Sequence, residues 1–255
     1  MYLSKSIQYV IAKKINPDNL KDALVEVRYT QGISPELMLG FVSSILAPLG
    51  YQYLPVPNQN INIALNNNQQ IAFGLGSNSG GFLLKTIIRI QFIANQIIFN
   101  CLADKYAGWE KYSQIISTII SSLFDKKAIK DFNRISIRYI SEFKNIDIYQ
   151  GIKGTIDISN AGLKLDNSIL RLVDESDNLK TYVILTNKAK RISQSPQGQK
   201  IIEASLVDIN VYENFNPVSD LNILRNKLNQ IHTKQKEVFF GLINNDFLDK
   251  LNPEY

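Results

Sequence analysis

Strict alternation of apolar and charged residues in two segments is the feature that most restricts the fold of this chain. The segments are "DALVEVRYT" (22–30) and "DFNRISIRYISEF" (131–143), and in both a charged or polar residue occupies nearly every second position. A period of two residues is typical of a β-strand with one buried and one solvated face. The sequence therefore predicts a sheet with an apolar side and a charged side.

The charged positions of these strands are the candidate ligand- or partner-binding residues. If the two strands are neighbours, their charges fall on one sheet face. There they form either cross-strand ion pairs or a groove for an acidic ligand or peptide. A further strand predicted over 82–93 adds polar residues to this groove. The candidate residues are Glu26, Arg28, Lys85, Arg89, Gln91, Arg134 and Arg138.

The order of predicted elements favours an α+β fold with antiparallel, hairpin-rich sheets and about three principal helices. The helices are expected over 34–50, over 108–127 and from Ser219, as N-cap, to about Ile243. Besides the segments above, strands are expected over 51–55, 61–66, 70–75, 96–102, 154–159, 162–174, 179–192 and 199–213.

The chain is expected to divide into an α+β N-terminal half, 1–150, and a strand-rich C-terminal half, 151–255, that ends in a long helix. Two arrangements stay open: two similar sheet-plus-helix halves, or one continuous domain. A length of 255 residues suits either, because it is enough to bury a core in one large or two small domains.

A long uncharged run extends from Leu37 to Leu84. Its most apolar part, "LMLGFVSSILAPLG" (37–50), is shorter than the roughly 18 apolar residues that a membrane span needs. We therefore expect no membrane span here. We expect a helix that is buried within the chain, with cover by a partner chain as the alternative.

The glycine-rich stretch "GLGSNSGG" (74–81) invites comparison with phosphate-binding loops. A Walker A loop places a lysine directly after its last glycine, whereas Phe82 follows here and Lys85 comes later. The third glycine of the dinucleotide-binding pattern is replaced by Ser79, and a strand rather than a helix follows. The stretch is therefore predicted to be a hairpin loop between two strands.

Cysteine and histidine usage restricts the chemistry of the chain. Cys101 is the only cysteine and His232 the only histidine, so the sequence has no CxxC or HExxH metal motif and no intramolecular disulfide. We predict that Cys101 is a small buried side chain, and that His232 is exposed or makes a structural hydrogen bond. No catalytic residue, metal or cofactor is predicted. A reducing cytoplasm fits this composition, and the N-terminus does not have the pattern of a signal peptide.

A net charge of +5 permits nucleic-acid binding without concentrating charge in one stripe. The most basic segment, "TNKAKRISQSPQGQK" (186–200), is predicted to form a hairpin. Its candidate phosphate-contacting residues are Lys188, Lys190, Arg191 and Lys200. The segment has no interleaved aromatic residues, so a solvated turn is the alternative.

Four stretches in this order resemble a family of sporadically distributed, functionally uncharacterised bacterial proteins of about this length. They are "ALVEVRY" (23–29), "IIRIQFIANQIIFNCLADKYAGWEKY" (87–112), "RISIRYISEF" (134–143) and "LNQIHTKQKEVFFGLINNDFLDKLNPEY" (228–255). The family often has a tryptophan after the asparagine of the central hairpin, and here Cys101 follows Asn100. The resemblance implies an α+β fold and a bacterial source, and it transfers no catalytic residue.

The leading hypothesis is a non-enzymatic binding or assembly protein of the bacterial cytoplasm that acts through a protein partner. The sporadic distribution of the family suggests an accessory or antitoxin-like component of a defence or two-gene system. The first alternative is a nucleic-acid-binding module that uses sheet-face arginines and the basic hairpin. The second is an enzyme with an unrecognised site near Glu26, Arg138 and His232. The identity of the partner and homo-oligomer formation stay open.

Overall fold

The computed structural model describes most of the chain. The described residues are 11–16, 19–33, 35–55, 61–65, 69–73, 80–84, 88–93, 95–102, 106–156, 161, 164–175, 178–195 and 198–255. The glycine-rich residues 74–79 and Lys85 lie outside these ranges, as do 157–160 of the strand predicted over 154–159.

Strands and helices follow one another in the order expected of an α+β protein. The strands are β1 (Leu20–Gln31), β2 (Tyr51–Pro55), β3 (Ile61–Leu65), β4 (Gln69–Phe73), β5 (Gly80–Leu84), β6 (Ile88–Ile93), β7 (Gln96–Leu102), β8 (Ile129–Lys144), β9 (Ile169–Asp174), β10 (Lys180–Ser195) and β11 (Gly198–Val218). The helices are α1 (Pro35–Leu46), α2 (Trp109–Asp125), α3 (Ile148–Gly151), α4 (Leu221–Leu242) and α5 (Asn245–Lys250).

Within the described residues, nine strands form one sheet in the order β2-β5-β6-β7-β1-β8-β11-β10-β9, and β3 and β4 form a separate pair. Every strand pair among them is antiparallel. The three longest helices are α1, α2 and α4, so the predicted α+β class and antiparallel pairing are confirmed. The β8–β11 ladder joins strands of the predicted halves 1–150 and 151–255 in this one sheet.

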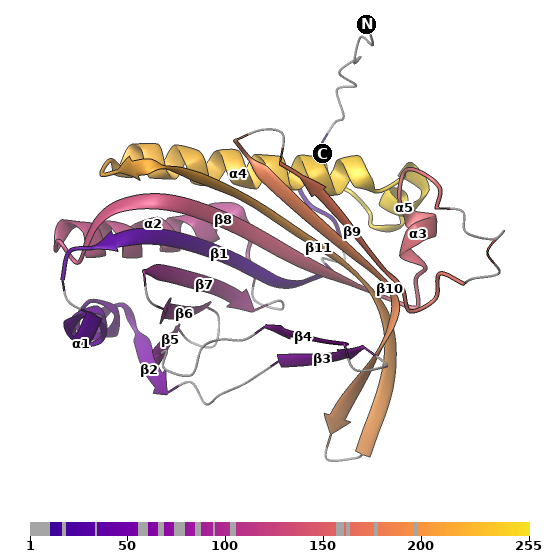
Figure 1. Ribbon diagram of the computed structural model, residues 1–255, viewed down its shortest axis with the longest axis horizontal. Helices are drawn as coiled ribbons and strands as arrows, with labels where there is room; N and C mark the ends of the chain where they lie inside the picture. The colour runs from indigo at the N-terminus through magenta and orange to yellow at the C-terminus, as the bar shows by residue number, and fades with distance from the viewer. Residues whose placement is uncertain are drawn as a thin grey trace, which may run out of the picture.

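The long strands arch across the molecule, with α2 and α4 on one side and the β3–β4 pair on the other (Figure 1). Helix α4 contacts both β8 and β11, and β3 contacts β10. The apolar core therefore lies between the sheet and the helix layer. Its sheet side is formed by alternate residues of neighbouring strands, among them Val25, Val27, Ile97, Phe99, Ile135, Ile137, Ile209 and Val211.

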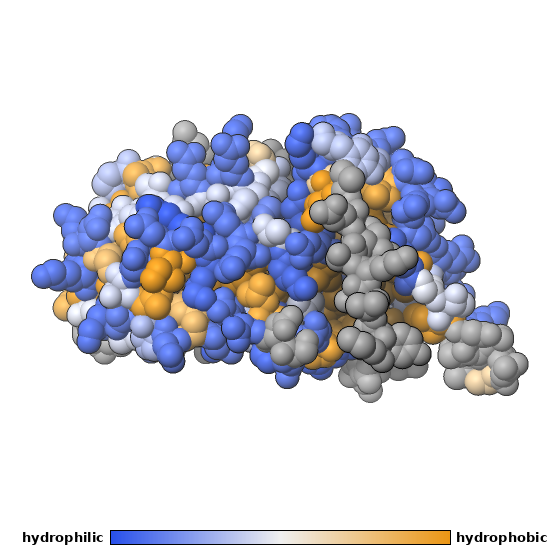
Figure 2. Space-filling model, turned by 90° about the horizontal axis from the view of Figure 1, so that it is seen from above, coloured by the Kyte–Doolittle hydropathy of each residue, from blue (hydrophilic) through white to orange (hydrophobic). Residues whose placement is uncertain are grey.

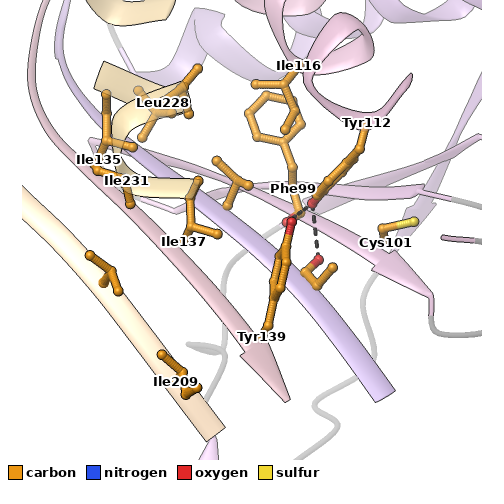
Figure 3. Close-up of a cluster of buried hydrophobic side chains, with 14 of the residues drawn as sticks. Phe99, Cys101, Tyr112, Ile116, Ile135, Ile137, Tyr139, Ile209, Leu228 and Ile231 are labelled. Carbon is orange, nitrogen blue, oxygen red and sulfur yellow. Dashed lines mark hydrogen bonds between the residues drawn. The ribbon is translucent and has the colours of Figure 1, made fainter. Parts of the chain in front are cut away.

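Tyr112 of α2 ties the helix layer to the centre of the sheet (Figure 3). Its hydroxyl donates to the carbonyl oxygens of Phe99, at 2.7 Å, and Ala23, at 3.1 Å. Ile116 of α2 and Leu228 and Ile231 of α4 bury their side chains in the same cluster. Cys101 is buried there as predicted, which makes it a core side chain.

The uncharged segment begins with α1, whose buried face confirms the predicted packing within the chain. Met38, Val42 and Leu46 are buried, whereas Leu37 is 64% exposed. A short 3-10 helix (Ala47–Leu49) follows α1, and its C-cap is Gly50, which has a positive φ of 86°. A glycine accepts this left-handed conformation without the steric cost of a side chain.

Two sequence predictions about the middle of the chain are wrong. The segment 82–93 contains two strands, β5 and β6, which pair with each other, where one long strand was expected. Alternation continues across "KTI" (85–87), which has no glycine, proline or asparagine to mark the reversal. The prediction of a hairpin loop over 74–81 is wrong at its flanks, because β4 pairs with β3 and β5 with β2 and β6, not with each other. Gly80 and Gly81 lie within β5, and 74–79 lie outside the described residues.

The predicted N-cap of the last long helix is wrong by one residue. Asp220, not Ser219, precedes α4, and its carboxylate accepts a hydrogen bond from the backbone N–H of Asn222 at 2.7 Å. Both residue types satisfy the free N–H groups of a helix start, so composition alone does not choose between neighbours.

The side chain of Asn187 in β10 forms hydrogen bonds with α3 and with the irregular segment before β9. Its side-chain oxygen accepts from the N–H of Ile148 at 2.9 Å, and its amide donates to the carbonyl of Leu165 at 3.1 Å. The residue is fully buried at a shift in the β10–β11 register. One side chain thus fixes α3 and the segment before β9 to the sheet.

We expect Asn187→Ala to lower the free energy of unfolding by about 2 to 4 kcal/mol, because it leaves a buried donor and a buried acceptor without partners. Urea denaturation followed by circular dichroism measures this loss. Asn222→Ala, at an exposed position of α4, is the control and should cost less than about 0.5 kcal/mol. Equal losses in the two variants would contradict the assigned role.

Candidate functional site

The charged residues predicted from the two alternating segments lie on the sheet face away from α2 and α4. Along β1, Val25 and Val27 are buried towards the helices, and Glu26 and Arg28 project from the opposite face. The β1–β8 register places Arg134 opposite Arg28. We call this surface the polar sheet face, and it comprises Asp22, Glu26, Arg28, Arg134, Ser136, Arg138, Asp208 and Asn210.

Glu26 is shared by the two arginines nearest to it. Its Oε1 accepts from Arg28 Nε at 2.8 Å and lies 3.6 Å from Arg134 Nε. Arg134 also donates from Nη1 to Asn214 Oδ1 at 3.1 Å, and its guanidinium lies over the ring of Tyr212, 3.8 Å from the centroid. These contacts join β1, β8 and β11 across one face.

Arg138 forms the best-defined ion pair of the polar sheet face. It donates from Nε and Nη2 to the two carboxylate oxygens of Asp208, at 2.9 and 2.6 Å. Beside it, Ser136 donates to Asn210 at 2.6 Å. A two-pronged contact of this kind fixes the guanidinium plane. Cross-strand pairing, one of the two readings of these charges, therefore accounts for the contacts of Arg134 and Arg138.

The candidate residues Arg89 and Gln91 lie on β6, which is two strands away from β1 in the sheet. Arg89 pairs in register with Asn100, and Asn100 donates to Asp22 at 3.4 Å. Burial raises the pKa of Asp22, an effect that the hydrogen bond from Asn100 and nearby cations partly oppose. Gln91 is buried, and its Nε2 has no acceptor in the described structure. Lys85 lies outside the described residues.

The predicted hairpin of the basic segment is confirmed by the β10–β11 ladder, which ends with Ser195 opposite Gly198. Lys188 lies within β10 at the register shift and has a positive φ of 45°. Its ammonium pairs with Asp166 at 2.9 Å and Asp147 at 3.3 Å, which raises its pKa. Lys190 is exposed opposite Glu203. For Arg191 and Lys200, only the strand positions of the backbone are described.

A cluster that the sequence analysis missed lies on the helix side. We define it as the aromatic cluster: Tyr106, Trp109, Tyr112, Tyr139 and His232. The His232 ring stacks on Trp109 with centroids 4.3 Å apart and planes at 4°, and the hydroxyls of Tyr106 and Tyr139 are 2.7 Å apart. Trp109 Nε1 donates to Asn229 at 3.0 Å. Burial of the ring is the main cause that lowers the pKa of His232 to about 4, and the positive charge of Lys236 is a smaller one.

The sheet separates the residues of the enzyme hypothesis. His232 packs near Tyr139, at a centroid distance of 6.1 Å, on the helix side. Arg138, the preceding residue, binds Asp208 on the polar sheet face, where Glu26 also lies. The structure therefore does not bring Glu26, Arg138 and His232 together as one catalytic group.

A groove of about 580 Å³ lies between α2 and α4 and is lined by hydroxyl-bearing residues of α2 and by Arg225. The hydroxyls of Thr118 and Ser122 donate to backbone carbonyls of their own helix. Arg225 donates to Ser121 at 3.2 Å. A nucleophilic hydroxyl needs a neighbouring base; the described lining of this groove contains no histidine, and its one carboxylate is Asp125, for which no hydrogen bond to a hydroxyl is described. Seen from the helix side, the surface is largely hydrophilic with separate apolar patches (Figure 2).

Comparison with known proteins adds no relative: no protein-family model matches the chain, and neither does any curated protein. In the described part of the chain, no group of three or more histidine, cysteine, aspartate or glutamate side chains is placed to hold a metal ion. None of the described helices combines the length and apolar character needed to cross a membrane.

Two kinds of residue escaped prediction for different reasons. The partners on β11 had a signal, because Asp208, Asn210 and Tyr212 alternate with buried residues as the arginines of β8 do. The aromatic cluster had none as a unit. His232 meets Trp109 and Tyr139 from elements far apart in the chain, and no local spacing encodes that contact.

We expect Asp208→Ala to destabilise the fold by about 2 kcal/mol, because Arg138 then loses both bonds in a largely buried position. Arg28→Ala is the matched control, since Arg28 lies on the same face but its side chain is 49% exposed. Its loss should stay below about 1 kcal/mol. Chemical denaturation of both variants tests the ranking, and a larger loss for Arg28→Ala would contradict it.

Because the pKa of His232 is lowered in the folded protein, we expect the free energy of unfolding to depend on pH in a specific way. Its pKa falls from 6.5 in the unfolded chain to about 4 in the folded one, so folding favours the neutral ring. This stabilisation is complete above pH 6.5 and is lost as the pH falls towards 4, by at most about 3 kcal/mol.

The matched variant is His232→Phe, which keeps a ring against Trp109 but does not titrate. The difference in unfolding free energy between the two proteins should shrink or reverse between pH 7 and pH 4.5. Because the chain has one histidine, its imidazole proton resonances report the pKa directly by NMR. A midpoint near 6.5 would show that the ring is not buried as described.

Proposed function

We propose that this chain is a non-enzymatic binding and assembly protein whose partner is another polypeptide, bound at the edge of the sheet formed by β9. The observation that carries the proposal is that the outer side of β9 has no strand partner among the described residues and that β9 has exposed apolar side chains. In the described structure β9 pairs only with β10, and Ile169, Leu172 and Val173 are 41%, 43% and 49% exposed. Such an edge is a template for strand addition.

We also propose that the two halves of the chain share one plan. The proposed repeat units differ from the predicted halves, because the first runs from β1 to α2 and the second from β8 to α4. In each unit a long strand is followed by a helix, which is only four residues long in α3. Three consecutively paired strands and a long helix come after it: β5-β6-β7 and α2 in the first unit, where β2, β3 and β4 intervene, and β9-β10-β11 and α4 in the second. The last of the three strands pairs with the long strand in both units. The long strand of each unit contains a similar tripeptide, "VRY" (27–29) in β1 and "IRY" (137–139) in β8.

This plan makes β5 the counterpart of β9, and the two edges differ. Strand β5 is covered by β2, which pairs with it antiparallel from Tyr51–Leu84 to Pro55–Gly80. No strand within the described residues takes the corresponding place on β9. A partner strand added antiparallel to β9 would complete the second half in the way that β2 completes the first.

Contacts elsewhere in the molecule support a binding role over a catalytic one. The arginines of the polar sheet face are engaged by Glu26, Asp208 and Asn214, and His232 stacks in the aromatic cluster. The family resemblance adds to the proposal a bacterial source and an accessory or antitoxin-like role in a defence or two-gene system, and the single cysteine adds a cytoplasmic location. The nucleic-acid alternative is weaker at Lys188, whose ammonium already pairs with two carboxylates.

We expect Val173→Lys to abolish capture of the partner without unfolding the chain, because it places a charge in the middle of the added-strand interface. The tagged full chain and the variant serve as dilute baits in an extract of the source cells. A polypeptide bound by the wild type should be depleted at least about tenfold on Val173→Lys.

Leu37→Lys is the control variant, since Leu37 is an exposed apolar residue of α1 away from β9. It should retain the partner at the wild-type level. If Val173→Lys retains every polypeptide that the wild type binds, the β9 edge is not the binding surface and the proposed function fails.

A further inference from the structure

We propose that the polypeptide bound at β9 is a second copy of this chain, and that two β9 strands pair antiparallel about a two-fold axis with Val173 opposite Val173. This inference rests on the proposed function, since it names the partner of the same edge. Symmetric pairs are the most common homo-oligomers, and they place one surface against itself. The question is therefore whether "ILRLVDE" (169–175) is complementary to itself.

A two-fold axis perpendicular to the sheet keeps each face of β9 on the same face of the joined sheet. Opposite residues of antiparallel strands point to the same side, so only residues of equal parity can face each other. Three registers then centre on the strand, with Arg171, Leu172 or Val173 on the axis. In each of them the helix layers of the two copies lie on the same side.

The charges of β9 distinguish these registers. With Arg171 on the axis, two guanidiniums face each other, which is unfavourable. With Leu172 on the axis, Arg171 faces Val173, Leu170 faces Asp174 and Ile169 faces Glu175, so all three charged residues meet apolar side chains. With Val173 on the axis, Asp174 still faces an apolar residue, Leu172, but Arg171 of each copy faces Glu175 of the other, and two opposite-charge pairs flank a valine pair.

The surroundings of Arg171 fit this register. Its guanidinium lies 5.4 Å from the ring centroid of Tyr182, and the Tyr182 hydroxyl donates to the carboxylate of Glu175 in the same chain. Arg171 and Glu175 are both exposed, at the outer strand of the sheet. Pairing in the proposed register inserts each arginine between its own Tyr182 and the Glu175 of the second copy. The strand also has no proline or lysine, the residues that commonly protect an edge from pairing.

Charge exchange tests the pairing on the purified full chain by sedimentation equilibrium from about 1 to about 200 µM, a range that suits a small interface. The wild type should show a monomer–dimer equilibrium. Arg171→Glu and Glu175→Arg should each weaken the dimer by about tenfold or more, because like charges then meet twice. The double variant, Arg171→Glu with Glu175→Arg, should restore it to within about threefold. Lys111→Glu, an equal charge change at an exposed site of α2, should leave it unchanged.

Single cysteines test the register. Val173→Cys faces itself and should form an intermolecular disulfide under mild oxidation, whereas Leu172→Cys faces Asp174 and should not. The native Cys101 is buried and does not interfere. Cross-linking of Leu172→Cys without Val173→Cys would overturn the register, and failure of the double charge variant to restore the dimer would overturn the pairing. A monomer at every concentration overturns the inference alone, since loss of a different polypeptide from the Val173→Lys bait would still support the proposed function.

Discussion

The ladder between β1 and β8 is the interaction on which the other parts of this fold depend. Strand β1 continues the sheet through β7 and β6, and β8 continues it through β11 and β10, so their pairing makes one sheet of the two halves. It also aligns the buried positions of both halves, with Val25 opposite Ile137 and Val27 opposite Ile135. Helices α2 and α4 can then cover a single apolar surface, and Tyr112 bonds to carbonyls on both sides of the β1–β7 pairing.

The same alternation that builds the core fills the opposite face with charge, and this has a consequence for function. Charges brought together by a ladder have partners at fixed spacing, so Arg138 meets Asp208 and Arg134 meets Glu26 within the molecule. A ligand at those arginines would compete with bonds that are already made. The outer edge of β9 is different, because no strand among the described residues pairs with it, so a partner strand there would not displace a ladder. The edge of the sheet is therefore a better candidate for partner binding than the polar sheet face.

Sequence reasoning succeeded where one segment carries its own period. The two-residue period of β1 and β8 gave their faces, and the apolar stripe of 108–127 gave α2, whose buried residues include Ile116, Ile119 and Leu123. It did not detect the reversal between β5 and β6, because alternation continues through it without a turn residue. It also could not find the stack of His232 on Trp109, because only tertiary packing brings α4 against α2 there.

A difference between β5 and β9 is the reason for proposing the β9 edge as the binding surface. The strands β5 and β9 hold equivalent places in the proposed repeat, and the chain supplies β2 to cover β5. An edge strand left open is commonly guarded by proline, by lysine or by a bulge, since an unguarded one pairs with other chains. Strand β9 has none of these and carries exposed apolar side chains on both faces, with Leu172 on one and Val173 on the other. The proposed binding role accounts for that combination more simply than tolerance of an aggregation hazard, because a single lysine on β9 would remove the hazard at little cost to the fold.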